Sequence, residues 1–583
     1  MMRRRSRQAA VLGMLAAFLV VPMVPARADH TNPNTPQWLT NGVAPGTGIA
    51  RGAGTWTFLE NFAANPGSDL KFFEKNGDLY SSSGTLGQGV TTAASSAPQP
   101  FIGQRILRLI DREVVNGQVT ETVDPTWVAD HGSAKCDINT AVTGLQHDVA
   151  VTPRVDPVLM ADTTDATGRC HDTPGGGLEL IDISGLGTPG FEVRELRLIH
   201  LRGLSHTVTA DPNRPGIFYN SASDSNTVNT WIDVINARSC MRFTDANGDG
   251  TITLAEKREQ CNPQVYRLSW EHRPDWSQRD PDGEELPRPN DPTSAANCHD
   301  ITVVRSTLYC AGLNATLIFD IRGMFVPGEG LNGRPLECTE RPGTRTAAMV
   351  TDCSAIGPNT PTTPVRHLRG WRFRGNYNHP GRPANQANNN LEVPSEEGVS
   401  VSHESDPSPD NKSLFVTDER GGGVVPPGAS CSPGIDNPYG NGGIHVYDLT
   451  KRVRDLNGGP PYFPYAKEVG DDKAVWRGSP TVPAATFCTV HVIHHIPDER
   501  RIFMGYYSQG VKVLDYSVDD QGRFTFTETA SFTLAGVNSW VTEPFKIVDN
   551  PDGTRTYFLM SSDIQRGIDF LTWTGPTNPI GRP

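Results

Sequence analysis

Short apolar strings alternate with polar, Gly- and Pro-rich stretches along most of the chain, and one kind of string recurs. It has two or three apolar residues, then Asp, then usually another apolar residue. The copies are Leu109-Ile110-Asp111, Leu180-Ile181-Asp182-Ile183, Trp231-Ile232-Asp233-Val234, Ile318-Phe319-Asp320-Ile321, Val446-Tyr447-Asp448-Leu449, Val513-Leu514-Asp515-Tyr516 and a degenerate Phe570-Leu571-Thr572-Trp573. Apolar runs this short, bounded by turn residues, predict β-strands.

Two further strings precede each copy, so the chain is a series of similar units. The nearer one is apolar and ends in small polar residues, as in Ile217-Phe218-Tyr219-Asn220-Ser221. The earlier one opens with His in five units, and from this His to the apolar residue of the next string the interval is 12 in four of the five. Seven units of three or four strands predict an all-β, seven-bladed β-propeller with long loop insertions, since radial repetition of small sheets protects their edges.

The apolar-apolar-Asp string resembles the strand signature of the LVIVD-repeat β-propeller proteins of the secreted bacterial type. The resemblance extends over about residues 55 to 575. It implies the propeller fold, but it implies no activity, because functions in that family are largely unassigned and one fold hosts many functions.

Unequal spacing between the units predicts how the chain is divided. We expect a signal peptide at 1–28, an N-terminal extension at 29–54 and the propeller at 55–583. Three insertions are expected within the propeller, at about 236–297, 322–400 and 421–443. Loops of this length are usually functional or poorly ordered.

The first residues and the composition predict export. A cluster of Arg residues precedes an apolar run from Ala9 to about Val24, and Ala26-Arg27-Ala28 fits a signal cleavage site. We therefore expect a secreted or periplasmic protein with no integral membrane segment after signal removal. The net charge of -13 argues against nucleic acid as a partner. An extracellular ligand or protein of unknown identity is the expected partner.

An even number of cysteines in an exported chain predicts disulfides. Proximity along the chain suggests five pairs, although the sequence does not fix the connectivity. They are Cys136 with Cys170, Cys240 with Cys261, Cys298 with Cys310, Cys338 with Cys353, and Cys431 with Cys488.

Residues 245–256, DANGDGTITLAE, match the EF-hand calcium loop at each constrained position. The predicted Ca²⁺ ligands are Asp245, Asn247, Asp249, Thr251 through its carbonyl, and Glu256. A single loop bracketed by Cys240 and Cys261 suggests a structural calcium site in an insertion rather than a switch. The alternative is an acidic turn with chance resemblance.

Innermost strands of a propeller line its axis, so the repeated His position predicts a ring of side chains. In the two units without His, the aligned residues are Asp69 and either Trp540 or Glu543, and the interval to the next strand favours Glu543. The candidate metal-binding ring is Asp69, His147, His206, His299, His403, His491 and Glu543. Imidazole and carboxylate ligands suit Fe, Cu, Zn or Mn. A His that only hydrogen-bonds neighbouring backbone is the structural alternative. The adjacent Asp148, Asp300 and Glu404 are expected to bond neighbouring blades.

Two functions follow from these features. The first is a secreted, calcium-binding propeller acting as a ligand- or protein-binding module, with an axial cluster that is a candidate transition-metal site. The second is a metal-dependent enzyme using the axial His cluster, more plausibly an oxidoreductase than a hydrolase. No sequence motif identifies a reaction or a catalytic residue.

Overall fold

The computed structural model describes residues 48–580, with internal exceptions. The exceptions are 63–66, 88–102, 116–117, 133–143, 155, 165–176, 203–204, 223–230, 270–297, 313–314, 344–348, 357–371, 379–398, 400, 420–441, 453–462, 479–487 and 565. The predicted signal peptide and the insertion at 421–443, apart from its last two residues, lie outside the described part.

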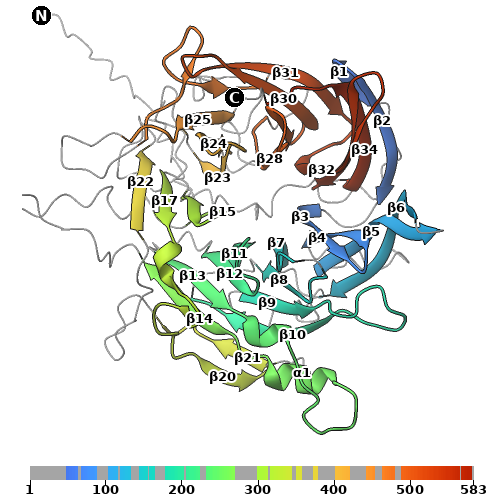
Figure 1. Cartoon of the computed structure of the whole chain (residues 1–583), viewed down its shortest axis with the longest axis vertical. Helices are drawn as coiled ribbons and strands as arrows, with labels where there is room; N and C mark the ends of the chain where they lie inside the picture. The colour runs from blue at the N-terminus through green and yellow to red at the C-terminus, as the bar shows by residue number, and fades with distance from the viewer. Residues whose placement is uncertain are drawn as a thin grey trace, which may run out of the picture.

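Seven groups of four antiparallel strands are arranged around a common axis, and the first two groups are joined by strand pairing into one larger sheet, which confirms the seven-bladed β-propeller (Figure 1). Their innermost strands are β3 (Gly67–Lys75), β7 (Gly144–Val151), β11 (Ser205–Ala210), β15 (Asp300–Val304), β23 (Ser402–Pro407), β28 (Ile493–His495) and β32 (Ser539–Asp549). The second strands are β4 (Asp78–Gly87), β8 (Leu159–Thr164), β12 (Ile217–Ala222), β16 (Thr307–Ala311), β24 (Ser413–Asp418), β29 (Arg501–Gly505) and β33 (Thr554–Asp563).

Each copy of the recurring apolar string lies in the third strand of a blade, as the repeat predicts. These strands are β5 (Gly103–Val115), β9 (Gly177–Asp182), β13 (Trp231–Asn236), β17 (Ala315–Asp320), β25 (Ile444–Asp448), β30 (Val511–Val518) and β34 (Gly567–Pro576). The outer strands are β6 (Gln118–Gly132), β10 (Arg194–His200), β14 (Gln264–Ser269), β22 (Arg372–Asn378), β27 (Val475–Trp476), β31 (Arg523–Thr533) and β2 (Thr55–Phe62).

The core lies between adjacent sheets. Between the third and fourth blades, for example, Tyr219 and Val234 pack in one cluster with Leu308 and Phe319. Burial of each such side chain contributes roughly 1.5–3 kcal/mol. Both faces of a blade are buried against its neighbours, which is why the recurring strings carry consecutive apolar residues instead of alternating apolar and polar ones.

The N-terminal strands close the ring. β2 pairs with β34 and becomes the outer strand of the last blade, while β1 (Ile49–Gly52) pairs with β31 of the blade before it. Blue N-terminal strands therefore lie beside red C-terminal strands in Figure 1. β1 belongs to the segment predicted as an N-terminal extension.

Two predicted insertions contain blade strands as well as peripheral structure. The 236–297 segment includes η1 (Arg238–Met241), α1 (Leu254–Gln260) and β14. The 322–400 segment includes η3 (Arg322–Met324), the short pair β18 (Phe325–Val326) and β19 (Gly330–Leu331), β20 (Thr339–Pro342), β21 (Met349–Asp352) and β22. β21 pairs in parallel with β10, so a segment from the fourth blade extends the second. The remaining short strand, β26 (Lys467–Glu468), pairs with β31.

Three of the predicted disulfides are confirmed: Cys240 with Cys261, Cys298 with Cys310, and Cys338 with Cys353. Cys488 is also disulfide-bonded. Its expected partner Cys431, and the predicted pair Cys136 and Cys170, lie outside the described residues.

Candidate metal centre

Four of the five predicted axial histidines form a continuous arc of buried rings. The centroids of His206 and His299 are 4.3 Å apart, those of His299 and His403 are 4.3 Å apart, and those of His403 and His491 are 3.9 Å apart. The Nε2 atoms of His206 and His299 approach to 2.9 Å. All four residues are at most 5% exposed. The side chain of His147 lies outside the described part of the chain.

A local irregularity of the inner strands places the ring residues. The register between the first and second strands shifts across Asp69, His147, His206, His403 and Trp540. Such β-bulges re-aim a side chain and recur next to functional sites. The same position in five blades therefore leaves the regular ladder, and the chain repeats this device together with the ring residue.

The bulge identifies Trp540 as the ring residue of the last blade. Its ring centroid lies 4.2 Å from that of His491, and its indole Nε1 donates to Asp69 Oδ1 at 2.9 Å. Glu543 lies elsewhere on the same strand, with Oε1 3.2 Å from His494 Nδ1. The interval that favours Glu543 misleads because another register shift follows in β32, between Pro544 and Lys546.

A carboxylate not predicted from the sequence joins the arc. Glu419 directly follows β24, is fully buried, and is anchored by a hydrogen bond from its N–H to the Val401 carbonyl. Its Oε2 lies 3.9 Å from His403 Nε2, and its Oε1 lies 3.9 Å from His491 Nε2. Ligand atoms of His299, His403 and Glu419 all lie within 4.8 Å of one another. Of the ring residues predicted from the sequence, this group contains His299 and His403.

The sequence signal for Glu419 is the end of the second strand. Asp418 stands where Asp563 stands in the last blade, because each carboxylate accepts a hydrogen bond from the N–H just before the innermost strand, that of Val401 or of Asn538. The residue that follows is Glu419 in one blade and Ile564 in the other. Because polar residues are common where strands end, this signal is weak.

Two carboxyl groups of the centre are buried, which makes their ionised forms costly. Burial raises the pKa of Glu419 well above its ordinary value, although a hydrogen bond from Tyr507 opposes the shift. Burial, and then the charges of Asp148 and Asp300, raise the pKa of Asp69 well above its ordinary value. Buried carboxyl groups of this kind are stabilised in ionised form by a cation nearby.

Carboxylates that follow the ring histidines hold the blades together, as expected. Asp148 Oδ2 accepts a hydrogen bond from Val208 N–H at 2.8 Å, and Glu404 Oε2 accepts one from Ile493 N–H at 2.7 Å. Each bond joins neighbouring innermost strands. Burial, and then the charge of Asp300, raise the pKa of Asp148 to about 7.

Two imidazoles and one carboxylate make a donor set that several metals use. The same combination binds catalytic zinc and non-haem Fe(II), leaving further coordination positions for water or substrate. The neutral imidazoles and the single carboxylate suit a borderline transition metal better than Ca²⁺, which takes six to eight oxygen ligands.

Away from the axis, the predicted calcium loop has a wrapped conformation. Asp245 accepts hydrogen bonds from Gly248 N–H at 2.7 Å and Gly250 N–H at 2.6 Å. These glycines have φ values of 74° and 89°, a left-handed conformation that suits glycine. At the other end, Glu256 accepts from Ala246 N–H at 3.1 Å and from Thr253 N–H at 2.8 Å. The predicted ligands are thus gathered on one short loop.

Helix α1 follows this loop and docks it onto the second blade. Thr253 and Glu256 form a capping box at its start. Lys257 Nζ lies 2.6 Å from Asp182 Oδ2, and Arg258 Nε donates to the Glu195 carbonyl at 2.9 Å. The loop from the third blade is therefore tied to the side of the second.

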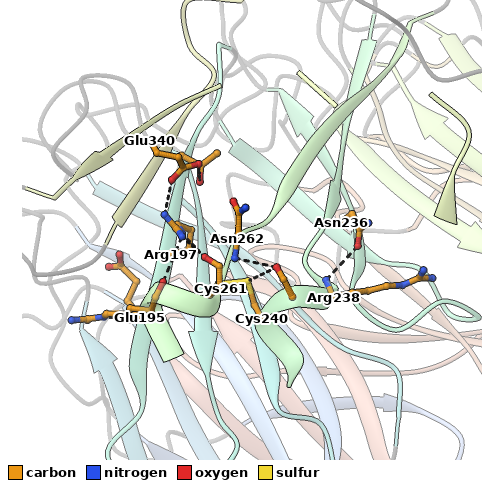
Figure 2. Close-up of a disulfide and its surroundings, with 11 residues drawn as sticks. Glu195, Arg197, Asn236, Arg238, Cys240, Cys261, Asn262 and Glu340 are labelled. Atoms are coloured by element: carbon orange, nitrogen blue, oxygen red, sulfur yellow. Dashed lines mark hydrogen bonds and ion pairs between the residues drawn. A yellow bond between two sulfur atoms is a disulfide. The ribbon is translucent and has the colours of Figure 1, made fainter. Parts of the chain in front are cut away.

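Arg197 links three peripheral segments. From β10 its guanidinium donates to the carbonyl of Cys261, just after α1, and to Glu340 Oε2 of β20 at 2.6 Å (Figure 2). The Cys240–Cys261 disulfide lies beside it. Burial lowers the pKa of Arg197, and Glu340 opposes that shift.

Comparison with known proteins adds little beyond the fold. No family model matches the sequence, and no curated protein matches it. Among solved structures, the β-propeller domain of Cps50 (Swd1) from Myceliophteria thermophila is similar with 8% identity and a TM-score of 0.38, covering 89% of this chain and 99% of that one. Sqt1 from Chaetomium thermophilum is similar with 9% identity and a TM-score of 0.33, covering 89% and 86%. Because both scores are low, the fold assignment rests on the seven blades themselves.

In the part of the chain that the structure describes, no helix is both long and apolar enough to cross a membrane.

Proposed function

We propose that this chain is an exported metal-binding β-propeller whose axial centre holds a transition-metal ion on His299, His403 and Glu419. The observation that carries the proposal is the convergence of three buried ligand atoms within 4.8 Å on the propeller axis. His206 and His491 flank the two imidazole ligands in the arc and are the next nearest candidate ligands. The propeller fold is also consistent with a protein-binding module.

The alternative role of these histidines is to bond neighbouring backbone. That role is supported for the carboxylates Asp148 and Glu404, which bond backbone N–H groups of the next blade. The side chains of the ring also contact one another face to edge or tilted, with centroids about as close as stacking allows. Four adjacent buried imidazoles bring several neutral nitrogen ligands to one place, which supports a metal site.

Metal analysis of the purified mature protein tests the proposal. We expect about one equivalent of Fe, Cu, Zn or Mn, either as isolated or after incubation with each ion, and loss of that equivalent in His299→Ala/His403→Ala. His494→Ala is the matched control, since His494 lies near the ring but pairs with Glu543. A wild-type protein that retains less than a tenth of an equivalent of every ion after desalting would overturn the proposal.

A metal-dependent enzyme is the second candidate, and the three-ligand set favours it. Three protein ligands leave coordination positions open, as in catalytic rather than structural sites. Azide added to the Cu²⁺ or Co²⁺ protein would occupy such a position and shift the visible spectrum. An unchanged spectrum at saturating azide would speak against an open site and hence against catalysis at the metal.

We further propose that the 245–256 loop binds Ca²⁺ as a structural ion. Support comes from the match at each constrained position and from the wrapped conformation of Asp245 and Glu256. Export is supported by the disulfides, which persist in oxidising compartments.

A further inference from the structure

We propose that Tyr507 is a positioning residue of the axial centre: its hydroxyl holds one oxygen of Glu419, so that the other oxygen is the metal ligand. The inference rests on the proposed function, because it assigns a role at the same site. No sequence pattern pointed to Tyr507, which lies in the turn between β29 and β30.

The two oxygens of Glu419 have different surroundings. Oε1 accepts a hydrogen bond from the Tyr507 hydroxyl. Oε2 faces the other way, 3.9 Å from His403 Nε2. A tyrosine hydroxyl that donates to Oε1 uses one of its lone pairs and fixes the carboxylate plane, which leaves Oε2 directed toward the imidazoles.

Tyr507 is itself held firmly. Its φ of 45° is in the left-handed region, which is unfavourable for a residue with a Cβ and persists only where the surroundings enforce it. Its N–H donates to the Ser539 carbonyl at 3.0 Å, and its carbonyl accepts from Ser539 N–H at 3.0 Å and from Gly510 N–H at 2.9 Å. This backbone strain occurs beside the candidate metal centre and not at a surface turn.

The side chain is confined by the ring as well. Its centroid lies 5.8 Å from that of His491, almost perpendicular to it, and 6.3 Å from that of Trp540. Tyr507 is fully buried, so its hydroxyl has no route to bulk water. Three blades therefore meet at this contact: Glu419 comes from the fifth, Tyr507 from the sixth and Trp540 from the seventh.

Partners that orient a metal ligand change metal affinity without touching the metal, and their loss typically costs 10–100-fold. Without the Tyr507 hydroxyl, Glu419 loses the hydrogen bond that distinguishes its two oxygens, and Oε1, which lies 3.9 Å from His491 Nε2, can compete with Oε2 as the metal ligand. Metal binding would then be weaker and its geometry different.

Tyr507→Phe tests this role, because it removes only the hydroxyl. The probe is Co²⁺, whose visible bands report both occupancy and coordination geometry. We expect the Kd for Co²⁺ to rise about 10–100-fold in the full-length variant, and the shape of the bands at saturation to differ from wild type.

Tyr506→Phe is the matched control. Tyr506 is the adjacent residue, is also fully buried, and donates its hydroxyl to the Gly442 carbonyl at 3.2 Å rather than to the Glu419 carboxylate. It should lower thermal stability as Tyr507→Phe does but leave the Co²⁺ bands and Kd unchanged. Equal Kd values and identical bands for Tyr507→Phe and wild type would overturn the inference alone, whereas a wild-type protein that binds no Co²⁺ would overturn the proposed function.

Discussion

At the scale of single residues, the aspartate of the recurring string pairs with a different cation in different blades. Asp233 Oδ1 lies 2.9 Å from Arg267 Nε on the neighbouring strand, and Asp182 Oδ2 lies 2.6 Å from Lys257 Nζ in α1. In the sixth blade, Asp515 pairs with Arg501. In these three blades the repeated Asp is therefore a structural anchor, and its cationic partner comes from the neighbouring strand, from the second strand of the same blade or from another blade.

Arg501 provides the sharpest test of that view. Its guanidinium is fully buried and donates to both oxygens of Asp515, at 2.7 and 2.8 Å, and to the Tyr557 hydroxyl at 2.6 Å. It also lies 2.9 Å from Glu499 Oε2 in the turn before β29, and its bond to Tyr557 of β33 joins the sixth blade to the seventh.

We expect Arg501→Met to lower the free energy of unfolding by about 3–5 kcal/mol, because it leaves the largely buried Asp515 carboxylate without its cation, whereas Glu499 keeps its pair with Arg555. Arg523→Met should cost less than about 1 kcal/mol, since the Arg523–Asp519 pair lies on an exposed turn. Urea unfolding of both variants provides the comparison. Similar losses in the two would show that the Arg501 network contributes no more than a surface ion pair.

At the scale of elements, the sequence predicted more of the sheets than of the site. Periodic apolar strings identified the inner, second and third strands of the blades, because burial between neighbouring sheets requires those residues. The outer strands β14 and β22 were hidden within predicted insertions, since outer strands are under weaker packing constraints.

From the sequence, residues of the axial ring could be predicted only where they occupy the same repeated position in successive units. His206, His299, His403 and His491 were found because a His recurs at the start of the innermost strand in these units, and the interval to the next strand is the same for all of them except His299. The sequence favoured Glu543 over Trp540, because it does not show the register shift that directs the Trp540 side chain. It missed Glu419, because the end of a strand decides where that side chain points. Which atoms of separate blades converge is a property of tertiary structure that one unit of the repeat does not contain.

The calcium loop makes a prediction for one element. Glu256 has two roles, as the last expected Ca²⁺ ligand and as the third residue of the capping box of α1. Glu256→Gln removes the charge needed for calcium but keeps a residue type that suits the capping box.

For wild type we expect Ca²⁺ at one hundred times its Kd to stabilise the folded protein by about 2.7 kcal/mol. Glu256→Gln should lose most of this gain while unfolding at nearly the same temperature as wild type in EDTA. Thermal unfolding with and without Ca²⁺ measures both quantities. A wild-type melting temperature that does not respond to calcium would contradict the assignment of the loop.

At the scale of the whole molecule, the circle of seven blades is closed by contacts between N-terminal and C-terminal strands. Trp56 of β2 stacks on Phe532 of β31 with centroids 5.3 Å apart and lies 6.0 Å from Trp573 of β34. Nearby, Asn61 Nδ2 donates to Asp569 Oδ1 at 2.6 Å. These contacts join the last two blades to the N-terminal segment.

Trp56→Ala should therefore destabilise the protein by about 2 kcal/mol or more, somewhat below the ~3–5 kcal/mol typical of a fully buried Trp. Leu59→Ala on the same strand is the control, because Leu59 is 42% exposed, and it should change stability by about 0.5 kcal/mol or less. Denaturant unfolding and the rate of proteolysis near the N-terminus measure the effect. Equal stability of the two variants would mean that β2 does not secure the closure.

The pairing of β2 with β34 also sets an order of events in time. β2 has to wait for β34, so the ring of blades cannot close until β34 has been synthesised. Contacts across such sequence separations carry a high entropic cost and slow the closing step of folding. Until then the nascent chain carries an unpaired β2 and an incomplete last blade, which makes it a substrate for chaperones until β34 emerges.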